Sequence, residues 1–305
     1  MKAFIGVTDF DWYSFLSAIP DLDEVNFWQP SASSQFKALQ PGEPFLFKLH
    51  SPQNYIVGGG FFAHSTILPA SLAWEAFGIK NGANTLKEKR RRIEKYRKTT
   101  PSPTEDYEIG CILLEEPFFF QKDEWIPAPT DWSPNIVRGK GYDTTVGEGR
   151  RVWDAVMLRL HAVDIPAVQD ERRRYGDPVL VTPRLGQGSF RIIVTDAYGR
   201  RCAITSERTL PALDAAHIKP YIENGPHDVN NGILLRSDIH KLFDTGYVTI
   251  ADDYHFEVSR RIREEYENGR DYYALNGKKL LLPTDSIVWP DKKYIRWHNN
   301  NVYKG

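Results

Sequence analysis

The sequence predicts an α+β protein of two domains, each with its own hydrophobic core. The chain has 305 residues, and a single domain commonly takes about 100 to 200. The first half alternates short β-rich runs with turn residues, whereas part of the second half is typical of a strand, a loop, and a strand that enters a helix. We therefore expect domains at 1–160 and 189–305, joined by a proline-containing, charged linker at 161–188.

The composition is that of a globular protein, with 41% hydrophobic and 26% charged residues. No apolar run approaches the roughly 20 residues that a membrane span requires, and the N-terminus lacks the apolar core of a secretory signal. Cys111 and Cys202 are far apart, which argues against a disulfide framework and a four-cysteine zinc site. We expect a soluble cytoplasmic protein with no membrane partner. Because the net charge is −1, binding of nucleic acid must use local basic patches.

Apolar alternation and turn residues indicate the elements of the first domain. The predicted strands are 44–50, 55–64 and 109–120, and the predicted helices are 71–78 and 86–98. Three consecutive glycines, 58–60, predict a bulge or a close backbone approach within the second strand. The proline- and tryptophan-rich segment 125–143 is expected to be a long, ordered functional loop.

The second domain is expected to begin with a helix at 190–199, which Gly199 ends. A strand at 212–218, a loop, a turn into a helix over 233–244, and a returning strand at 247–250 are expected to follow. Cys202 lies in an expected strand, CAIT, and is interpreted as a small buried apolar residue.

Three polar residues stand at fixed separations in this framework: Asn231 follows His217 by 14 residues, and His240 follows Asn231 by nine. The segments AAHI, NNGILL and HKLFD surround them. This region, from about residue 186 to residue 250, resembles the HNH endonuclease family. The resemblance implies a ββα-metal fold and metal-dependent hydrolysis of phosphodiester bonds.

The resemblance implies a role for each of these residues. His217 would be the general base that activates water, since a neutral imidazole has a pKa near the operating pH. Asn231 would hydrogen-bond near the base histidine while its loop sets the geometry. His240 would bind a cation that stabilises charge on the phosphate and the leaving oxygen. His227, in the loop between them, is interpreted as a loop residue or a phosphate contact.

The other metal ligands are expected on the same helix and strand. Asp244 lies four residues after His240 and shares its helix face. The family often has a metal-binding residue just before the first histidine, but here that residue is Ala216, which cannot bind metal. Asp214 lies on the same strand face as Ala216 and is the natural substitute. Which aspartate completes the site stays open, and this donor set suits Mg²⁺, Mn²⁺, Ni²⁺ or Co²⁺.

The segment 27–64 resembles the opening of an EVE-type domain of the PUA superfamily, to which SRA and YTH domains are related. The likeness rests on Trp28, on the strand PGEPFLFKLH and on the following IVGGG. The resemblance implies a β-barrel with surrounding helices that holds one extruded, often methylated, base in an aromatic pocket. The expected pocket residues are Trp28, Trp132, Asn135, Tyr142 and Asp143, with Asn135 or Asp143 reading the edge of the base. The alternative is that these aromatic residues fill the barrel core.

Basic residues give candidate phosphate contacts in both domains. They are Arg90 and Arg91 in the basic helix of the first domain, and Arg191 and Lys219 in the second. For the helix of the first domain, a solvated face is the alternative, because Glu88 and Glu94 dilute its charge.

The sequence therefore predicts a modification-dependent restriction endonuclease, of the kind that serves phage defence. Its first half would recognise 5-methyl- or 5-hydroxymethylcytosine in double-stranded DNA by base flipping, and its second half would cut. A sequence-specific or non-specific HNH nuclease and a non-catalytic reader of modified bases are the alternatives. With one nuclease site per chain, a double-strand break needs a homodimer or two independent nicks.

Overall fold

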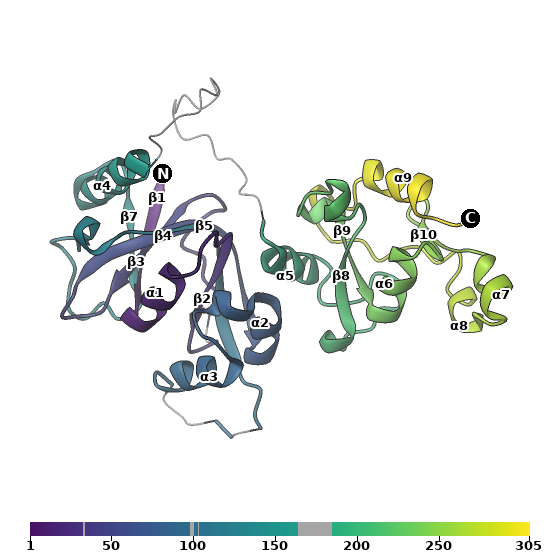
Figure 1. Cartoon of the computed structure of the whole chain (residues 1–305), viewed down its shortest axis with the longest axis horizontal. Coiled ribbons are helices and arrows are strands. Elements are labelled where there is room, and N and C mark those ends of the chain that lie inside the picture. The colour runs from purple at the N-terminus through teal and green to yellow at the C-terminus, as the bar shows by residue number, and fades with distance from the viewer. Residues whose placement is uncertain (33, 98–100, 103, 164–184) are drawn as a thin grey trace. The chain divides into compact units, whose positions relative to one another are not determined.

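The computed structural model describes residues 1–32, 34–97, 101–102, 104–163 and 185–305 (Figure 1). The chain divides into two compact units, Met1–Pro183 (unit 1) and Arg184–Gly305 (unit 2). The middle of the predicted linker, 164–184, lies outside the described residues, and its ends overlap helices α4 (Gly147–Val163) and α5 (Gln187–Ala197). No helix within these described ranges is long and apolar enough to cross a membrane.

Unit 1 is organised around a mixed β-sheet, which agrees with the expected α+β class. Its strands are β1 (Lys2–Thr8), β2 (Glu24–Gln29), β3 (Pro44–Leu49), β4 (Tyr55–Pro69), β5 (Glu108–Phe119), β6 (Ile126–Pro127) and β7 (Gly139–Asp143). They run in the order β2-β5-β4-β3-β1-β7, with β6 paired to β4; β1 and β3 are parallel, and the other pairs are antiparallel. Among the described residues no pairing of β2 with β7 closes this path, so the sheet is open where a barrel was expected.

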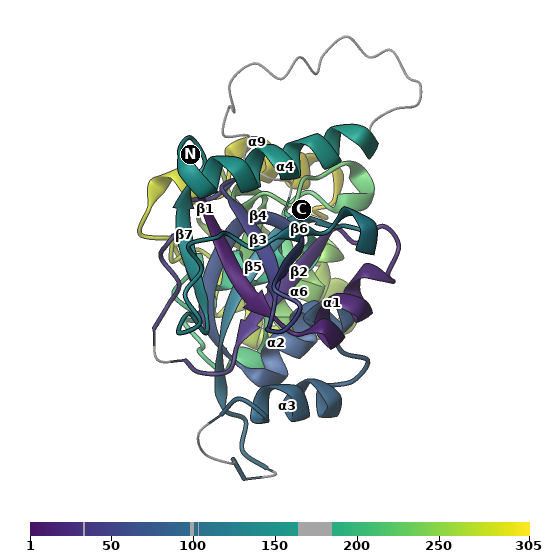
Figure 2. The same ribbon diagram turned by 90° about the vertical axis from the view of Figure 1, so that its left-hand side faces the viewer.

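Helices cover both faces of this sheet. They are α1 (Phe10–Ser17), α2 (Ala70–Phe77), α3 (Leu86–Glu94) and α4, with short 3-10 turns η1 (Gly78–Asn81) and η2 (Lys122–Glu124). Because side chains alternate along a strand, Phe45 and Phe47 of β3 join a cluster with Leu16 of α1, whereas Leu46 joins a cluster with Val152 of α4. Both views of unit 1 accordingly place α1 and α4 on opposite sides of the sheet (Figures 1 and 2).

The glycine run in β4 makes the close approach that the sequence predicts. A Cβ atom on Gly59 would lie 2.7 Å from the Phe118 ring and 2.8 Å from the carbonyl oxygen of Phe45, and the β4–β5 register shifts between Gly59 and Phe61. The predicted functional loop at 125–143 is only partly a loop, since its two ends form β6 and β7. These short strands pair with β4 and β1, partners far away in sequence, and no local pattern announces such pairing.

Unit 2 contains two separate two-stranded sheets within its described residues. One pairs β8 (Leu213–His217) with β9 (Gly232–Arg236), and the other pairs β10 (Val248–Ile250) with β11 (Phe256–Val258). Its helical elements are α5, α6 (Ser237–Asp244), α7 (Arg261–Tyr266), α8 (Arg270–Tyr273) and α9 (Lys292–Asn301), with η3 (Leu210–Ala212), η4 (Tyr221–Glu223), η5 (Val229–Asn231) and η6 (Ser286–Val288). The expected returning strand is therefore β10, but it pairs with β11 and not with β8 or β9.

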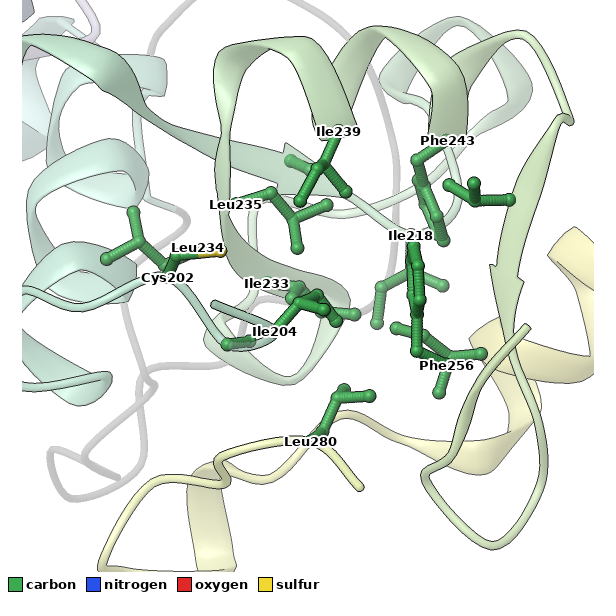
Figure 3. Packing of buried hydrophobic residues seen from close by; sticks show 14 of the residues in the cluster. Cys202, Ile204, Ile218, Ile233, Leu234, Leu235, Ile239, Phe243, Phe256 and Leu280 are labelled. Carbon is green, nitrogen blue, oxygen red and sulfur yellow. The ribbon is translucent and has the colours of Figure 1, made fainter. Parts of the chain in front are cut away.

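A single apolar cluster holds unit 2 together. Figure 3 shows Ile233 and Leu235 of β9 packed with Ile239 and Phe243 of α6. Cys202 is buried in the same cluster as the sequence predicts, but residues 202–205 form a turn and not a strand, because the backbone N–H of Ser206 donates to the carbonyl of Cys202.

Candidate active site

The strands β8 and β9 and the helix α6 bring the two histidines of the motif onto one frame. His217 ends β8 and pairs in register with Gly232 of β9, while His240 lies in the middle of α6, which packs against both strands. Gly232 allows α5 to pack closely, since a Cβ at this position would lie 2.4 Å from Cγ2 of Val194 and 3.0 Å from the Phe190 ring. The side chain that stacks on His217 comes from the same helix α5.

Both candidate aspartates lie against His240. The Nδ1 atom of His240 is 3.5 Å from Oδ2 of Asp214, and its Nε2 atom is 3.2 Å from Oδ2 of Asp244. Ala216 is completely buried and contributes nothing to this group. The structure therefore brings together the three side chains that the sequence nominates as metal ligands.

The electrostatics of this group suit a bound cation. Burial raises the pKa of Asp244 against the opposing effect of His240, and the charge of Asp214 raises it further. A divalent ion would offset the repulsion between the two carboxylates, and one imidazole with two carboxylates is a donor set that Mg²⁺, Mn²⁺, Ni²⁺ and Co²⁺ accept. In the described part of the chain, no three such side chains converge on one point as a preformed metal cage. The imidazole instead lies between the two carboxylates, with one ring nitrogen near each.

His217 lies in an environment that keeps its imidazole neutral. Its ring stacks on Phe190, with centroids 3.8 Å apart and planes 13° from parallel. Burial, and to a smaller extent the imidazoles of His227 and His240, lowers the pKa of His217 to about 4. Because the charge of His240 is one cause of this lowered pKa, His240 lies within electrostatic reach of His217.

Asn231 is fully buried and acts on the loop between the two strands. Its Oδ1 accepts from the backbone N–H of Lys219 at 2.9 Å, and its Nδ2 donates to the carbonyls of Lys219 and Pro226, each at 2.9 Å. The loop is tight, since a Cβ on Gly225 would lie 1.9 Å from the carbonyl oxygen of Lys219. Asn231 is thus a positioning residue that acts through the loop backbone.

His227, interpreted from the sequence as a loop residue or a phosphate contact, lies against His217. Its Nδ1 lies 2.9 Å from Nε2 of His217, and its ring stacks on Tyr221 at 4.6 Å and 8°. No local sequence pattern marks this contact, because it depends on the path of the loop that Asn231 holds at the carbonyl of Pro226.

Two of the four residues expected to contact phosphate, Lys219 and Arg90, lie over aromatic rings. The Lys219 ammonium lies 5.4 Å from the centroid of the Trp297 ring, beside the site, and Arg191 is half-buried on α5. In unit 1, Arg90 donates to the carbonyl of Glu105 at 2.7 Å and lies over the Tyr107 ring, whereas Arg91 is exposed.

Unit 1 contains a cavity of about 570 Å³ that one of the five predicted pocket residues lines. That residue is Trp28, whose indole N–H donates to the carbonyl of Asn81 at 3.0 Å. The cavity is also lined by Trp12, Phe27, Asp9, His50, Tyr96, Arg97 and Arg138.

The other four predicted pocket residues lie away from this cavity. Trp132 and Tyr142 pack with the cluster on the α4 face of the sheet, and the Tyr142 hydroxyl donates to Asp131 at 2.7 Å. Asp143 accepts from the backbone N–H of Thr145 at 2.9 Å, and Asn135 is exposed. The pairing of β7 with β1 accompanies the packing of Trp132 and Tyr142 on the α4 side, whereas Arg138, just before β7, lines the cavity.

A carboxylate and two flat rings lie together at the cavity wall. The Tyr96 hydroxyl donates to Oδ1 of Asp9, and Nε2 of His50 is 3.7 Å from the same oxygen. The rings of His50 and Tyr96 are nearly parallel, 8° apart with centroids at 6.2 Å. Burial and the Asp9 carboxylate raise the pKa of Tyr96, so it remains a hydrogen-bond donor at neutral pH.

Residues 213–244 thus form a strand–loop–strand–helix frame that carries a neutral histidine and a His–carboxylate group, the arrangement expected of a ββα-type nuclease. Residues 202–251 match the family model described as HNH endonuclease. The C-terminal part of the chain therefore contains an HNH endonuclease domain, and that family implies hydrolysis of phosphodiester bonds.

Two solved structures are similar to this chain at low identity. An ASCH protein from Zymomonas mobilis, ZmASCH in its S128A form, is 11% identical, with a TM-score of 0.32 and coverage of 49% of this chain and 94% of that one. The modification-dependent TagI restriction endonuclease is 13% identical, with a TM-score of 0.28 and coverage of 97% of this chain and 81% of that one. No curated protein matches the sequence.

Proposed function

We propose that the protein is a DNA endonuclease that cuts at the site formed by His217 and His240, and that unit 1 directs it to modified cytosine. The observation that carries the nuclease proposal is the shared frame of β8, β9 and α6, which holds a neutral imidazole close to a His–carboxylate group. A base and a ligand group that act on one phosphate need this proximity.

The residues of unit 2 divide the chemistry between them. Asp214, His240 and Asp244 would hold a divalent ion, which when bound would stabilise charge on the phosphate and on the leaving oxygen. His217 takes a proton from water, because its low pKa leaves it unprotonated at neutral pH. Lys219 lies at the start of the loop that follows β8 and supplies a positive charge for the DNA backbone.

The cavity of unit 1 supports recognition of a flipped base. Its volume of about 570 Å³ lies within the range of small-ligand pockets, and Trp28, His50 and Tyr96 offer flat faces on which a base can stack. Asp9 offers a carboxylate oxygen, the acceptor that pairs with the exocyclic amino group of cytosine. This arrangement favours 5-methyl- or 5-hydroxymethylcytosine over a base without such an amino group.

Digestion of matched plasmids tests the proposal. Unmodified, 5-methylcytosine and 5-hydroxymethylcytosine copies of one plasmid are incubated with the full chain and Mg²⁺ or Mn²⁺, and only the modified copies are expected to be cut. Trp28→Ala should weaken cleavage of modified DNA, whereas Trp132→Ala, on the other face of the sheet, should not. Equal cleavage of all copies would identify a nuclease without modification dependence. Binding of modified DNA without cleavage would identify a reader that does not cut.

A further inference from the structure

Four rings, those of Phe190, His217, His227 and Tyr221, contact one another in turn at the candidate active site. Phe190 of α5 stacks on His217 at 3.8 Å, and the Nε2 atom of His217 lies 2.9 Å from Nδ1 of His227. His227 stacks in turn on Tyr221, with planes only 8° apart. His217 is therefore held on its face by an apolar ring and on one edge by a second imidazole.

The contact between the two histidines restricts where their protons lie. A neutral imidazole carries one N–H donor and one acceptor nitrogen, so a hydrogen bond between two neutral rings needs one proton between them. If that proton belongs to His217, its Nδ1 keeps a lone pair. If it belongs to His227, the proton of neutral His217 is on Nδ1, and neither nitrogen of His217 can accept a proton from water.

We propose that His227 is a positioning residue for the general base: its Nδ1 accepts from Nε2–H of His217 and so leaves Nδ1 of His217 free to take the proton of the attacking water. This inference rests on the proposed function, which makes His217 the base. It assigns to a second histidine the orienting task that a carboxylate or a backbone carbonyl performs for many catalytic and metal-bound histidines.

The loop around His227 is built to hold this ring in place. Asn231 clamps the carbonyl of Pro226, the residue next to His227, and the tight turn at Gly225 leaves no room for a Cβ atom. The Tyr221 ring stacks on the His227 ring, with centroids 4.6 Å apart. These contacts give the acceptor nitrogen a fixed direction, which a tautomer-selecting residue needs.

The hydrogen bond also matters after proton transfer. When Nδ1 of His217 takes a proton, the ring becomes a cation inside a half-buried pocket. The His227 imidazole lowers the pKa of His217 through charge repulsion when it is itself protonated. When it is neutral, its Nδ1 at 2.9 Å gives the cation a charge-assisted hydrogen bond. Loss of the acceptor would leave the Nε2–H of His217 without this partner and would slow the chemical step, while DNA binding would be unchanged.

Three substitutions of His227 separate the hydrogen bond from the packing. His227→Asn keeps a side-chain oxygen near the position of Nδ1, His227→Phe keeps a ring against Tyr221 without an acceptor, and His227→Ala removes both. With Mn²⁺ and modified plasmid, we expect kcat to fall about 10- to 100-fold for Phe and Ala at nearly unchanged KM, and to stay within a few-fold of wild type for Asn. A wild-type kcat in His227→Phe would overturn the proposal.

Nitrogen NMR gives a readout that needs no cleavage. In full-length protein with ¹⁵N-labelled histidine, the His217 signals, assigned from a His217→Gln spectrum, should show a protonated Nε2 and an unprotonated Nδ1 at neutral pH. His227→Phe should change this pattern and His227→Asn should keep it. A proton on Nδ1 of His217 in the wild type would refute the inference. If the protein cuts no DNA but shows the expected tautomer, the proposed function fails and the assignment of the hydrogen bond stands.

Discussion

Replacement of Asn231 by alanine should release the loop that carries His227. The side chain makes three buried hydrogen bonds, one from the N–H of Lys219 and two to the carbonyls of Lys219 and Pro226. Each such bond contributes about 1 kcal/mol net, and a buried group left without a partner costs about 1–3 kcal/mol. We therefore expect Asn231→Ala to destabilise the loop by about 3 kcal/mol or more.

Hydrogen exchange on the full chain measures this effect directly. The amide of Lys219 is the donor to Asn231, so its protection factor reports the loop contact. A loss of about 3 kcal/mol corresponds to roughly a hundredfold drop in protection, since about 1.4 kcal/mol is a factor of ten. Amides of the open sheet in unit 1 serve as the internal control.

Asn231→Asp is the sharper companion variant. Aspartate has almost the same shape and still accepts from Lys219, but it presents an oxygen, where Nδ2 was, to two carbonyl oxygens. We expect it to be no better than alanine, because a buried charge would face acceptors only. Wild-type protection of the Lys219 amide in either variant would refute the view that Asn231 acts through this loop.

Three further predictions address packing, pH and metal. Gly232→Ala should lower the free energy of unfolding by about 1–3 kcal/mol in urea titrations, because its Cβ would overlap Val194; adding Val194→Ala should recover part of the loss, and no recovery would contradict the packing argument. Burial lowers the pKa of His298 to about 4, whereas the unfolded chain has about 6.5, so the unfolded state binds an extra proton between these values. The free energy of unfolding should therefore fall by about 3 kcal/mol for this residue as pH falls from 6.5 to 4. His298→Gln should reduce the slope of the unfolding free energy against pH by the equivalent of one proton. An unchanged slope in that variant would show that His298 does not cause this pH dependence. Chelation by EDTA should abolish cleavage. Asp244→Asn should weaken Mn²⁺ binding at least about tenfold by calorimetry, whereas the control Asp238→Asn, also on α6 but paired with Arg236, should not. Equal affinity for Mn²⁺ in wild type and Asp244→Asn would exclude Asp244 as a ligand.

The frame of the nuclease site could be predicted because its signals are local. Strand alternation places Asp214, helix periodicity pairs His240 with Asp244, and each residue lies within an element of a few residues. His227 could not be assigned in this way, because its contact with His217 depends on the path of an irregular loop. Asn231, whose side chain holds that loop, was recognised from its spacing to the two histidines, but its hydrogen bonds to the loop backbone could not be predicted.

The cavity of unit 1 was predicted less completely for the same physical reason. Trp28 was nominated by the resemblance of 27–64 to an EVE-type domain, and it lines the cavity. Asp9, His50 and Tyr96 come from three separate parts of the chain, and they meet only through the parallel pairing of β1 with β3 and the position of the segment after α3. Within the expected segment 132–143, Trp132 and Tyr142 pack on the α4 face while Arg138 lines the cavity, a division set by the pairing of β7 with β1, which has no local signature.

The sheet of β8 and β9 has only two strands, so it depends on the helices packed around it. This dependence sets a lower limit on the size of a fragment that can fold with the site intact. The stretch that matches the family, 202–251, omits both α5, whose Phe190 stacks on His217, and α9, whose His298 stacks on Phe243 at 3.8 Å. A fragment trimmed to the family boundaries would keep every polar motif residue and lose the apolar supports on either side of them. A fragment intended for fusion to a DNA-binding module should therefore contain residues 187–305.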